Sequence, residues 1–362
     1  MSSATKQLRL PPMPRISDLM RLYGLRAKKQ LSQNFILDLN VTDKIARKAD
    51  VFDCNVIEVG SGPGSLSRSL LNAGLRHLYA VEIDKRFLPS LELLQDASDG
   101  HMSIYHADIL KFDMVKPLKN VISAEWESDD LPNLRLVGNL PFSVSIPLFL
   151  QWLEALSTRS GVFSFGRIPM TLVFQKEVGQ NMVAEALNYD RSRLAIMAQN
   201  YCHVSRAMEI SSSVFVPEPK VDAWLMHFIP LKKPAIDAPF NVVEQVVKAI
   251  FSKRRKVIKT PLRFSFYYEN NKRNNSNKNR LTNRLQLTAL NTDKVSKNES
   301  LTLLQLNILN TYKVTRIDSP TLLRSTILNT NKITRTNSPI LLRLTILFTD
   351  KLTKTDSLTA PK

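Results

Sequence analysis

The sequence predicts an α/β fold with a doubly wound sheet of parallel strands, followed by a short helical segment and a low-complexity tail. Between Asn55 and about Phe228, short runs rich in β-branched residues alternate with stretches of helical periodicity, the pattern of a parallel sheet covered by helices. A linker containing Pro234 and Pro239 follows, and 241–251 is again apolar at helical spacing. After Thr260 the composition changes abruptly to Asn, Lys, Arg, Thr, Ser and Leu.

These patterns define the elements and the domain boundaries that we expect. Seven strands with intervening helices make a Rossmann-like domain, and a helix at 66–71 should follow the first strand. The strands are expected at 55–59, 78–81, 103–106, 134–137, 170–174, near 195–204 and at 221–228. We divide the chain into a basic N-terminal segment (1–29), the Rossmann-like domain (30–230), the start of a helical domain (231–260) and the tail (261–362).

The charge balance indicates a polyanionic partner. The formal net charge is +18, and the tail carries 17 Lys/Arg against 6 Asp/Glu, so the first 260 residues hold a net +7. Nucleic acid or an anionic membrane surface would attract such a chain. No run approaches the roughly 18 apolar residues that span a bilayer, and Cys54 and Cys202 have no neighbours at metal-ligand spacing. We expect a soluble chain in a reducing compartment, without a metal.

The first 29 residues contain seven Lys or Arg and a single acidic residue, Asp18, with serine and threonine between them. This composition is typical of an organelle transit peptide. An ordinary basic arm that binds RNA would have the same composition, so both interpretations stay open at this point.

The tail contains a 19-residue repeat. Leu290-Asn291-Thr292 recurs at residues 309, 328 and 347, the last time as Leu347-Phe348-Thr349. Stacked repeats could form a solenoid. Each unit, however, has one short Leu/Ile patch among charged and polar residues, which buries too little surface to offset the chain entropy. We therefore predict disorder or weak transient helix for 261–362.

A glycine-rich turn ends the first predicted strand. Gly60, Gly62 and Gly64 allow the backbone to approach a ligand where a Cβ would collide. The spacing differs from the G-x-G-x-x-G of dinucleotide folds, and no Gly-Lys-Ser/Thr follows, which excludes a P-loop. The turn predicts a nucleotide-like ligand, although a tight structural turn is the alternative.

Two acidic residues follow at the ends of the next two strands. Glu82 comes 22 residues after Gly60, where a carboxylate can accept hydrogen bonds from both ribose hydroxyls. Asp108, after the third strand, could accept one from an adenine amino group. A solvated strand end is the alternative for Glu82. Together with the glycine turn, these residues predict an adenosyl pocket at three consecutive strand ends.

The fourth strand ends in Gly138-Asn139-Leu140-Pro141-Phe142, which indicates the reaction class. An exocyclic adenine amine is a poor nucleophile because its lone pair is delocalised into the ring, so methyl transfer needs acceptors that hold the amine. The Asn139 side-chain carbonyl and the Leu140 backbone carbonyl can supply two. Pro141 keeps the turn out of helical geometry, and Phe142 can stack on the base. The motif predicts adenine N6 methylation without a general base.

As a set, these motifs identify a family resemblance over residues 8–260. The chain resembles the rRNA adenine dimethyltransferases of the bacterial KsgA type, and within them the mitochondrial branch, which is also associated with transcription. The residues that carry the resemblance are 29–35 (KQLSQNF), 58–64, Glu82, Asp108, 139–142 (NLPF), 215–221 (FVPEPKV) and 254–256 (RRK).

The resemblance implies a function and a site. It implies transfer of two methyl groups from S-adenosyl-L-methionine to each of two adjacent adenosines near the 3′ end of small-subunit ribosomal RNA. It further implies that Phe215 and Phe142 sandwich the target adenine, beside the catalytic Asn139, Leu140 and Pro141. The cofactor would be held by Gln33, Asn34, Ile36, Gly60, Gly62, Glu82, Ile83, Asp108 and Asn139.

The same resemblance implies a setting for the reaction. The partner would be an immature small ribosomal subunit, and the protein would be located in the mitochondrial matrix. The chain would be a monomer. Basic residues at 28–29 and 253–256 are expected to contact RNA phosphates, although the second cluster could simply end a helix.

One departure from the family and two alternative functions stay open. In the family a helical C-terminal domain continues past the Arg-Arg-Lys motif, whereas here the resemblance stops near Thr260. The chain could therefore be a mitochondrial transcription accessory factor that uses the fold as a nucleic-acid scaffold. A DNA adenine methyltransferase is disfavoured, because those enzymes usually carry Pro-Pro-Tyr or Pro-Pro-Phe where Leu140-Pro141-Phe142 stands here.

Overall fold

The computed structural model describes residues 10–27, 33–185 and 188–252. The chain divides into one unit of residues 1–235 and 239–247 and a second of 236–238 and 248–362. The described part of the second unit is 236–238 and 248–252, which includes the end of helix α8 (Phe240–Phe251). That helix confirms the one predicted at 241–251. The repeat tail and both basic clusters, 28–29 and 253–256, lie outside the described residues, and the predictions made for them stay predictions.

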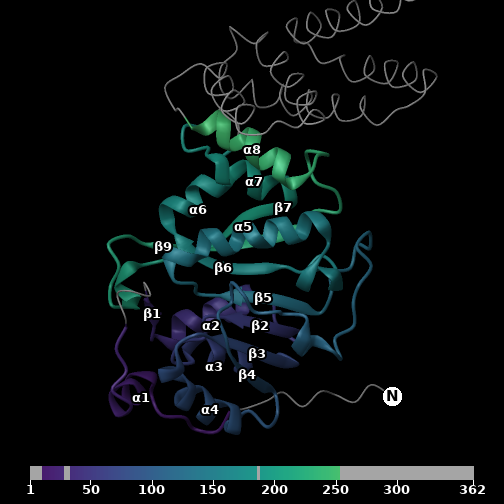
Figure 1. The fold of residues 1–362 in the computed structure, drawn as a ribbon. Coiled ribbons are helices and arrows are strands. Elements are labelled where there is room, and N and C mark those ends of the chain that lie inside the picture. The colour runs from purple at the N-terminus through teal and green to yellow at the C-terminus, as the bar shows by residue number, and fades with distance from the viewer. Residues whose placement is uncertain (1–9, 28–32, 186–187, 253–362) are drawn as a thin grey trace, which may run out of the picture. The chain divides into compact units, whose positions relative to one another are not determined.

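A seven-stranded sheet forms the centre of the first unit (Figure 1), which confirms the Rossmann-like α/β fold. Its strand order is β4-β3-β2-β5-β6-β9-β7. Neighbours from β4 to β6 pair in parallel, as helical crossovers require. The strands are β2 (Asn55–Val59), β3 (His77–Glu82), β4 (Met102–His106), β5 (Leu134–Gly138), β6 (Met170–Gln175), β7 (Cys202–Ile210) and β9 (Ala223–Pro230).

The last part of the sheet corrects two expectations. Strand β9 runs antiparallel to both β6 and β7, because it returns from β7 through residues 211–222 without a helical crossover. The strand predicted near 195–204 is mostly helix α7 (Arg193–Tyr201), and β7 begins only at Cys202. Ala195, Ile196, Met197 and Ala198 are all buried, and a short apolar run of this kind does not distinguish a buried helix from a buried strand.

Helices cover the sheet (Figure 1) and bury its apolar side chains. Helix α2 packs on α3, and α5 and α6 both pack on α7. Ile45 of α2, Leu70 and Leu71 of α3 and Val56 of β2 belong to one buried cluster. The helices are α1 (Ile16–Leu22), α2 (Leu39–Lys48), α3 (Ser65–Asn72), α4 (Leu88–Ala97), α5 (Phe142–Thr158), α6 (Lys176–Val183), α7 and α8, with 3-10 turns η2 (Lys85–Phe87), η3 (Lys116–Leu118), η4 (Gly161–Phe165) and η5 (Ser212–Val214). Helix α3 confirms the one predicted at 66–71.

A second, two-stranded sheet joins distant parts of the chain. Strand β1 (Phe35–Ile36) pairs antiparallel with β8 (Phe215–Val216), with Ile36 opposite Phe215. The segment before α2 is therefore attached to the connection between β7 and β9.

The carboxyl ends of the central strands meet at one edge of the large sheet. In the pairing register, Val59 lies opposite Val81 and Gly138, and Glu82 lies opposite His106. The residues that follow β2, β3, β4 and β5 therefore gather at this edge, where ligands bind in open α/β sheets.

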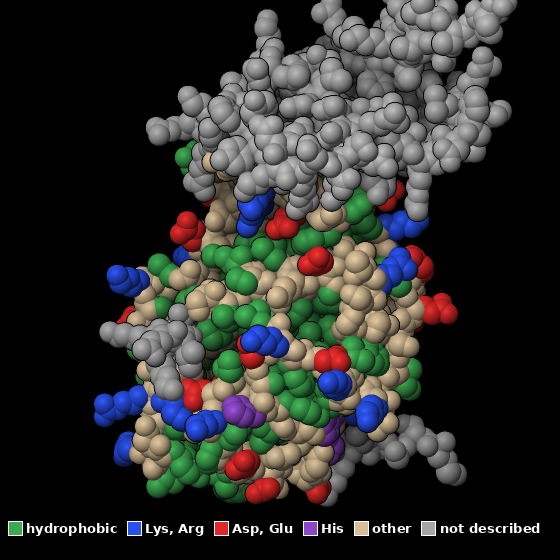
Figure 2. All heavy atoms as spheres, in the orientation of Figure 1, with side chains coloured by type: hydrophobic (Ala, Val, Ile, Leu, Met, Phe, Trp, Pro, Cys, Tyr) green, Lys and Arg blue, Asp and Glu red, His purple; other side chains and the backbone are tan. Residues whose placement is uncertain are grey.

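The surface of the described residues mixes charges of both signs. On the face drawn in Figure 2, Lys and Arg side chains are interspersed with Asp and Glu and separated by apolar and neutral surface. Among the described residues, no helix combines the length and apolar character needed to cross a bilayer. Neither do these residues contain a cluster of three or more His, Cys, Asp or Glu that could hold a metal ion.

Candidate functional site

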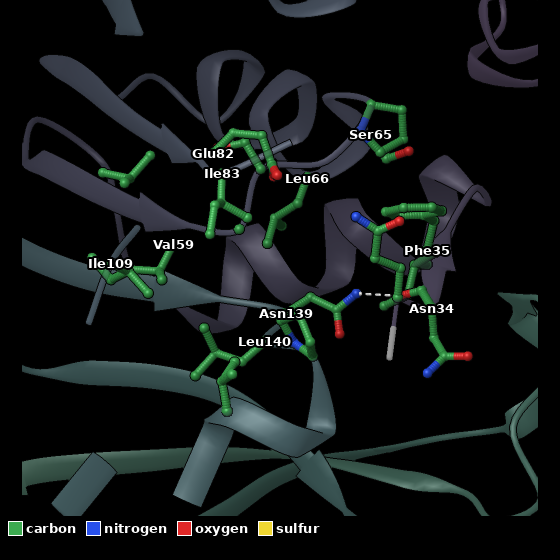
Figure 3. Close-up of a pocket in the computed structure, with 18 of the residues that line it drawn as sticks. Asn34, Phe35, Val59, Ser65, Leu66, Glu82, Ile83, Ile109, Asn139 and Leu140 are labelled. Atoms are coloured by element: carbon green, nitrogen blue, oxygen red, sulfur yellow. Dashed lines mark hydrogen bonds between the residues drawn. The ribbon is translucent and has the colours of Figure 1, made fainter. Parts of the chain in front are cut away.

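A cavity of about 190 Å³ lies at the carboxyl edge of the sheet (Figure 3). Its walls come from the turns after β2, β3, β4 and β5 and from residues 33–36, which we call the cover segment. The predicted site residues that line it are Gln33, Asn34, Ile36, Gly60, Glu82, Ile83, Asp108, Asn139, Leu140 and Pro141. Gln33 and Asn139, which are 106 positions apart in the sequence, thus line the same small cavity.

Gly62 shapes the wall without lining the cavity. Its φ of +55° is in the left-handed region that favours glycine, and its N–H donates to Glu82 Oε2 at 2.7 Å. A Cβ built on Gly62 would lie 2.9 Å from Phe35 Cε1 in the cover segment. The glycine therefore lets the turn hold the Glu82 carboxylate while the cover segment lies directly against it.

We expect Gly62→Ala to weaken cofactor binding and to lower stability. A left-handed alanine costs about 1–2 kcal/mol, and the new methyl group would push Phe35 out of place. Gly100→Ala is the matched control, because Gly100 has a φ of +79° but nothing within 4 Å of its Cβ position. Both variants should lose free energy of unfolding in urea titrations, and Gly62→Ala should lose more because of the added contact with Phe35. Only Gly62→Ala should weaken S-adenosylhomocysteine binding in calorimetry, and equal binding by the two variants would contradict the contact.

Glu82 is held in the wall by backbone donors. The residue is 4% exposed, and its Oε1 accepts from the N–H of Asp84 at 2.8 Å while Oε2 accepts from Gly62. Burial raises the pKa of the Glu82 carboxyl, and the two N–H donors oppose that shift. Each carboxylate oxygen has a second lone pair. The group can therefore accept hydrogen bonds from a pair of ligand hydroxyls at the cavity edge.

Asn139 makes the contact that connects the β5 turn with the cover segment. Its Nδ2 donates to the backbone carbonyl of Asn34 at 3.0 Å, drawn as the dashed line in Figure 3. Because the amide nitrogen is used in this way, Oδ1 is the Asn139 atom available to accept from a substrate amine. Leu140 and Pro141 continue the same wall.

Asp108 lies on the wall formed after β4. It is half-buried, and its Oδ1 accepts from the N–H of Leu110 at 3.0 Å. The carboxylate is thus held by the following turn, with acceptor capacity left for a ligand amine.

The structure does not bring Phe142 and Phe215 to the cavity wall. Phe215 is 2% exposed and belongs to the same buried cluster as Ile45, Leu70 and Val56, and the half-buried Phe142 packs against that cluster. A ring with so little exposed surface has no open face, so Phe215 must move if it is to stack on a base. The predicted sandwich of a target adenine between these two rings stays a prediction.

Two serines that the sequence did not single out complete the wall. Ser61 and Ser65 line the cavity, and each is 5% exposed. The Ser61 hydroxyl faces the buried Glu58 carboxyl, whereas the Ser65 hydroxyl has no hydrogen-bond partner among the described residues. Buried hydroxyls normally have a partner. Ser61 stands between two of the turn's glycines and Ser65 begins α3, which is the only signal in the sequence for them. The open Ser65 hydroxyl and the close approach of the glycine backbone fit a polar, nucleoside-bearing cofactor.

Comparisons with known proteins identify the family of the chain. The family model described as ribosomal RNA adenine dimethylase matches residues 24–305, which extends beyond Thr260. A protein of Xenopus tropicalis named dimethyladenosine transferase 1, mitochondrial, is 50% identical over 249 residues, covering 68% of this chain and 72% of the relative. The Homo sapiens protein of the same name is 48% identical over 259 residues, covering 71% and 75%.

One solved structure agrees with the fold. The crystal structure of a dimethyladenosine transferase from Plasmodium falciparum has a TM-score of 0.54 to this chain at 22% identity, covering 75% of this chain and 96% of that one. With a family model that spans most of the sequence and relatives near 50% identity, the chain belongs to the ribosomal RNA adenine dimethylase family.

Proposed function

We propose that this chain is an S-adenosyl-L-methionine-dependent rRNA adenine N6,N6-dimethyltransferase. It would methylate two adjacent adenosines near the 3′ end of small-subunit ribosomal RNA. The observation that carries the proposal is the cavity itself, in which the glycine turn, Glu82 and Asp108 share one chamber with Asn139 and Leu140. Family membership supports the same reaction and the same cofactor.

The cofactor would be held by groups from three strand ends and from the cover segment. Glu82 would accept from the ribose hydroxyls, Asp108 from the adenine amine, and the open hydroxyl of Ser65 would pair with its polar amino-acid end. When bound, S-adenosyl-L-methionine supplies an electrophilic methyl group on a positively charged sulfur. Gln33, Asn34 and Ile36 would close the remaining side and exclude water.

The protein's part in the chemistry is to hold the target amine. Asn139 Oδ1 and the Leu140 carbonyl would accept the two N6 hydrogens, which favours a tetrahedral nitrogen whose lone pair points at the methyl group. The nitrogen loses a proton after each transfer, and the second methylation replaces the remaining hydrogen. Pro141, at the start of α5, has no N–H and keeps the preceding carbonyls outside the helix.

We place the enzyme in mitochondria, because relatives near 50% identity are named as mitochondrial. The matrix is the proposed compartment, since ribosomal RNA of the organelle would be the substrate. The proposed partner is an immature small ribosomal subunit, where methylation would support assembly.

The proposal is tested with the full chain, labelled S-adenosyl-L-methionine and immature small subunits whose RNA lacks these methyl groups. We expect label in N6,N6-dimethyladenosine after nuclease digestion, and primer-extension stops at two adjacent adenosines. A DNA duplex containing the same bases serves as the control and should take up no label. Label in DNA would overturn the choice of substrate. Cofactor binding without methyl transfer to RNA would favour the transcription-scaffold alternative.

A further inference from the structure

The cover segment is attached to the rest of the domain by a small set of specific contacts. The Gln33 side chain donates from Nε2 to Asp84 Oδ2 at 3.2 Å. The Asn34 carbonyl accepts from Asn139 Nδ2 at 3.0 Å. Phe35 meets the Phe87 ring edge-on, with ring centroids 5.1 Å apart. Three consecutive residues thus contact the ends of two different strands of the large sheet.

Asp84 is the polar anchor of this attachment. Its side chain is 3% exposed and lies two residues after Glu82. Arg86 donates to it from Nε at 2.9 and 3.1 Å and from Nη2 at 2.6 Å, and also reaches the Arg26 carbonyl through Nη1 at 3.1 Å. Charge-assisted, bidentate pairs of this kind are the stronger hydrogen bonds of proteins. Asp84 is therefore rigidly placed, and its Oδ2 accepts from Gln33 as well as from Arg86.

The apolar contacts support the same arrangement. Leu25, Phe35 and Phe87 form a small buried cluster of their own, separate from the main core. Phe87 belongs to η2, the turn that begins just after Asp84. The residues before and within the cover segment are thus held by the same short stretch, 84–87.

The Asn34 carbonyl determines which way the Asn139 amide points. An amide side chain can present either oxygen or nitrogen to the cavity, and a carbonyl neighbour accepts only from the nitrogen. With the cover segment docked, Nδ2 is used by Asn34, and Oδ1 is left for a substrate amine (Figure 3). Without it, either orientation of the amide would be open.

We propose that Asp84 is a positioning residue of this site: by holding Gln33 it docks the cover segment, and the docked segment orients the Asn139 amide. Cofactor retention and the orientation of the catalytic amide are then coupled through one structural element. The expected changes in KM and kcat rest on the proposed methyltransferase function. The expected changes in amide exchange concern the protein without ligand and do not depend on that function.

Asp84→Asn tests the anchor, with Asp53→Asn as the matched control. Asp53 also forms a bidentate pair, with Arg76 at 2.9 and 3.2 Å, but it precedes β2 at the opposite edge of the sheet from the cavity. In full-length protein without ligand, we expect backbone amides of residues 33–37 to exchange with deuterium about tenfold faster in Asp84→Asn, because a charged hydrogen bond is lost. Asp53→Asn should leave their exchange unchanged.

Binding and kinetics separate a positioning role from a purely structural one. S-adenosylhomocysteine should bind Asp84→Asn about tenfold more weakly. The KM for S-adenosyl-L-methionine should rise similarly, while kcat at saturation stays within about twofold, because bound cofactor restores docking. Arg86→Gln is the second test variant, for use if Asp84→Asn folds poorly, because the Arg86 side chain is partly exposed. It should show the same effects on binding and KM. The proposal would be overturned if Asp84→Asn and Asp53→Asn showed the same amide exchange at residues 33–37 and the same affinity for S-adenosylhomocysteine.

Asn139→Asp tests the contact from the other side. Aspartate has no N–H to give to the Asn34 carbonyl, so residues 33–37 should exchange faster in this variant even in the absence of RNA and cofactor. A residue that acts only on the target base would leave that exchange unchanged, and this result would contradict the coupling. The variants could change amide exchange and S-adenosylhomocysteine binding as expected while the wild-type protein methylates no RNA. In that case the proposed function fails and the docking inference stands.

Discussion

Asn139→Ala is expected to lower the kcat of methyl transfer by about 10³-fold, since losing one preorganised hydrogen-bonding group at a reacting centre has an effect of this size. The variant loses the Oδ1 acceptor for the target amine and the Nδ2 donor that holds the Asn34 carbonyl. We therefore also expect weaker binding of S-adenosylhomocysteine, but not its loss, because Glu82 and Asp108 remain. Single-turnover transfer to immature small subunits, with the cofactor at saturation, measures the effect on chemistry.

Asn72→Ala is the matched control for this prediction. Asn72 is the exposed last residue of α3 and does not line the cavity, so its loss should leave transfer unchanged. If Asn139→Ala retained activity within tenfold of wild type, the target amine would have to be held by other groups. The assignment of Asn139 would then be wrong.

Glu58→Gln is expected to make the protein more stable at pH 8 and to remove a pH dependence of its stability. Glu58 lies on β2 and is 1% exposed, so its carboxyl is removed from water in the folded protein. Burial raises the pKa of this carboxyl to about 7, against an ordinary 4.5, although the Ser67 hydroxyl donates to Oε2 at 2.5 Å. The uncharged glutamine amide avoids the cost of a buried charge.

The direction of the effect follows from proton binding. Between pH 4.5 and about 7 the folded protein keeps a proton on Glu58 that the unfolded chain has released. The stability from this group is therefore complete below pH 4.5 and falls as the pH rises to about 7. Above that pH the loss amounts to about 3 kcal/mol. Glu58→Gln should match wild type near pH 4.5 and exceed it by a similar amount at pH 8.

Urea unfolding of the full chain between pH 5 and 8.5 measures this difference. Glu154→Gln, on the exposed side of α5, is the control and should follow the wild-type pH profile. Parallel curves for Glu58→Gln and wild type would show that Glu58 ionises in the folded protein without a penalty.

The first five strands of the large sheet and the cavity-forming turns could be predicted because their signals are local. Strand β2, the glycines after it and the acidic residue ending β3 lie within 28 residues, and the left-handed backbone at Gly60, Gly62 and Gly64 favours glycine. Asn139, Leu140 and Pro141 follow β5 directly. Once the parallel order is known, their meeting at one edge follows from the geometry of the sheet.

Other features depend on contacts that no local pattern contains. The helix at 193–201 passes directly into the strand that begins at Cys202, and the apolar run 195–198 fits a buried strand as well as a buried helix. Phe215 belongs to a motif of the family, yet its pairing with Ile36 and its place in the core come from β1, about 180 residues earlier. Its distance from the cavity wall could not be inferred from the motif.

The attachment of the cover segment depends most strongly on the folded chain. Gln33 meets Asp84 across 51 positions and Asn139 meets Asn34 across 105, and both bonds exist only because the sheet brings the ends of β3 and β5 to one edge. The sequence specifies which groups can donate, accept or turn, since these are properties of single residues. Partners and orientations are set when packing brings distant side chains within hydrogen-bonding distance. The positioning role of Asp84 therefore could not be recognised in the sequence, and it follows from the contacts with Gln33 and Arg86 in the folded chain.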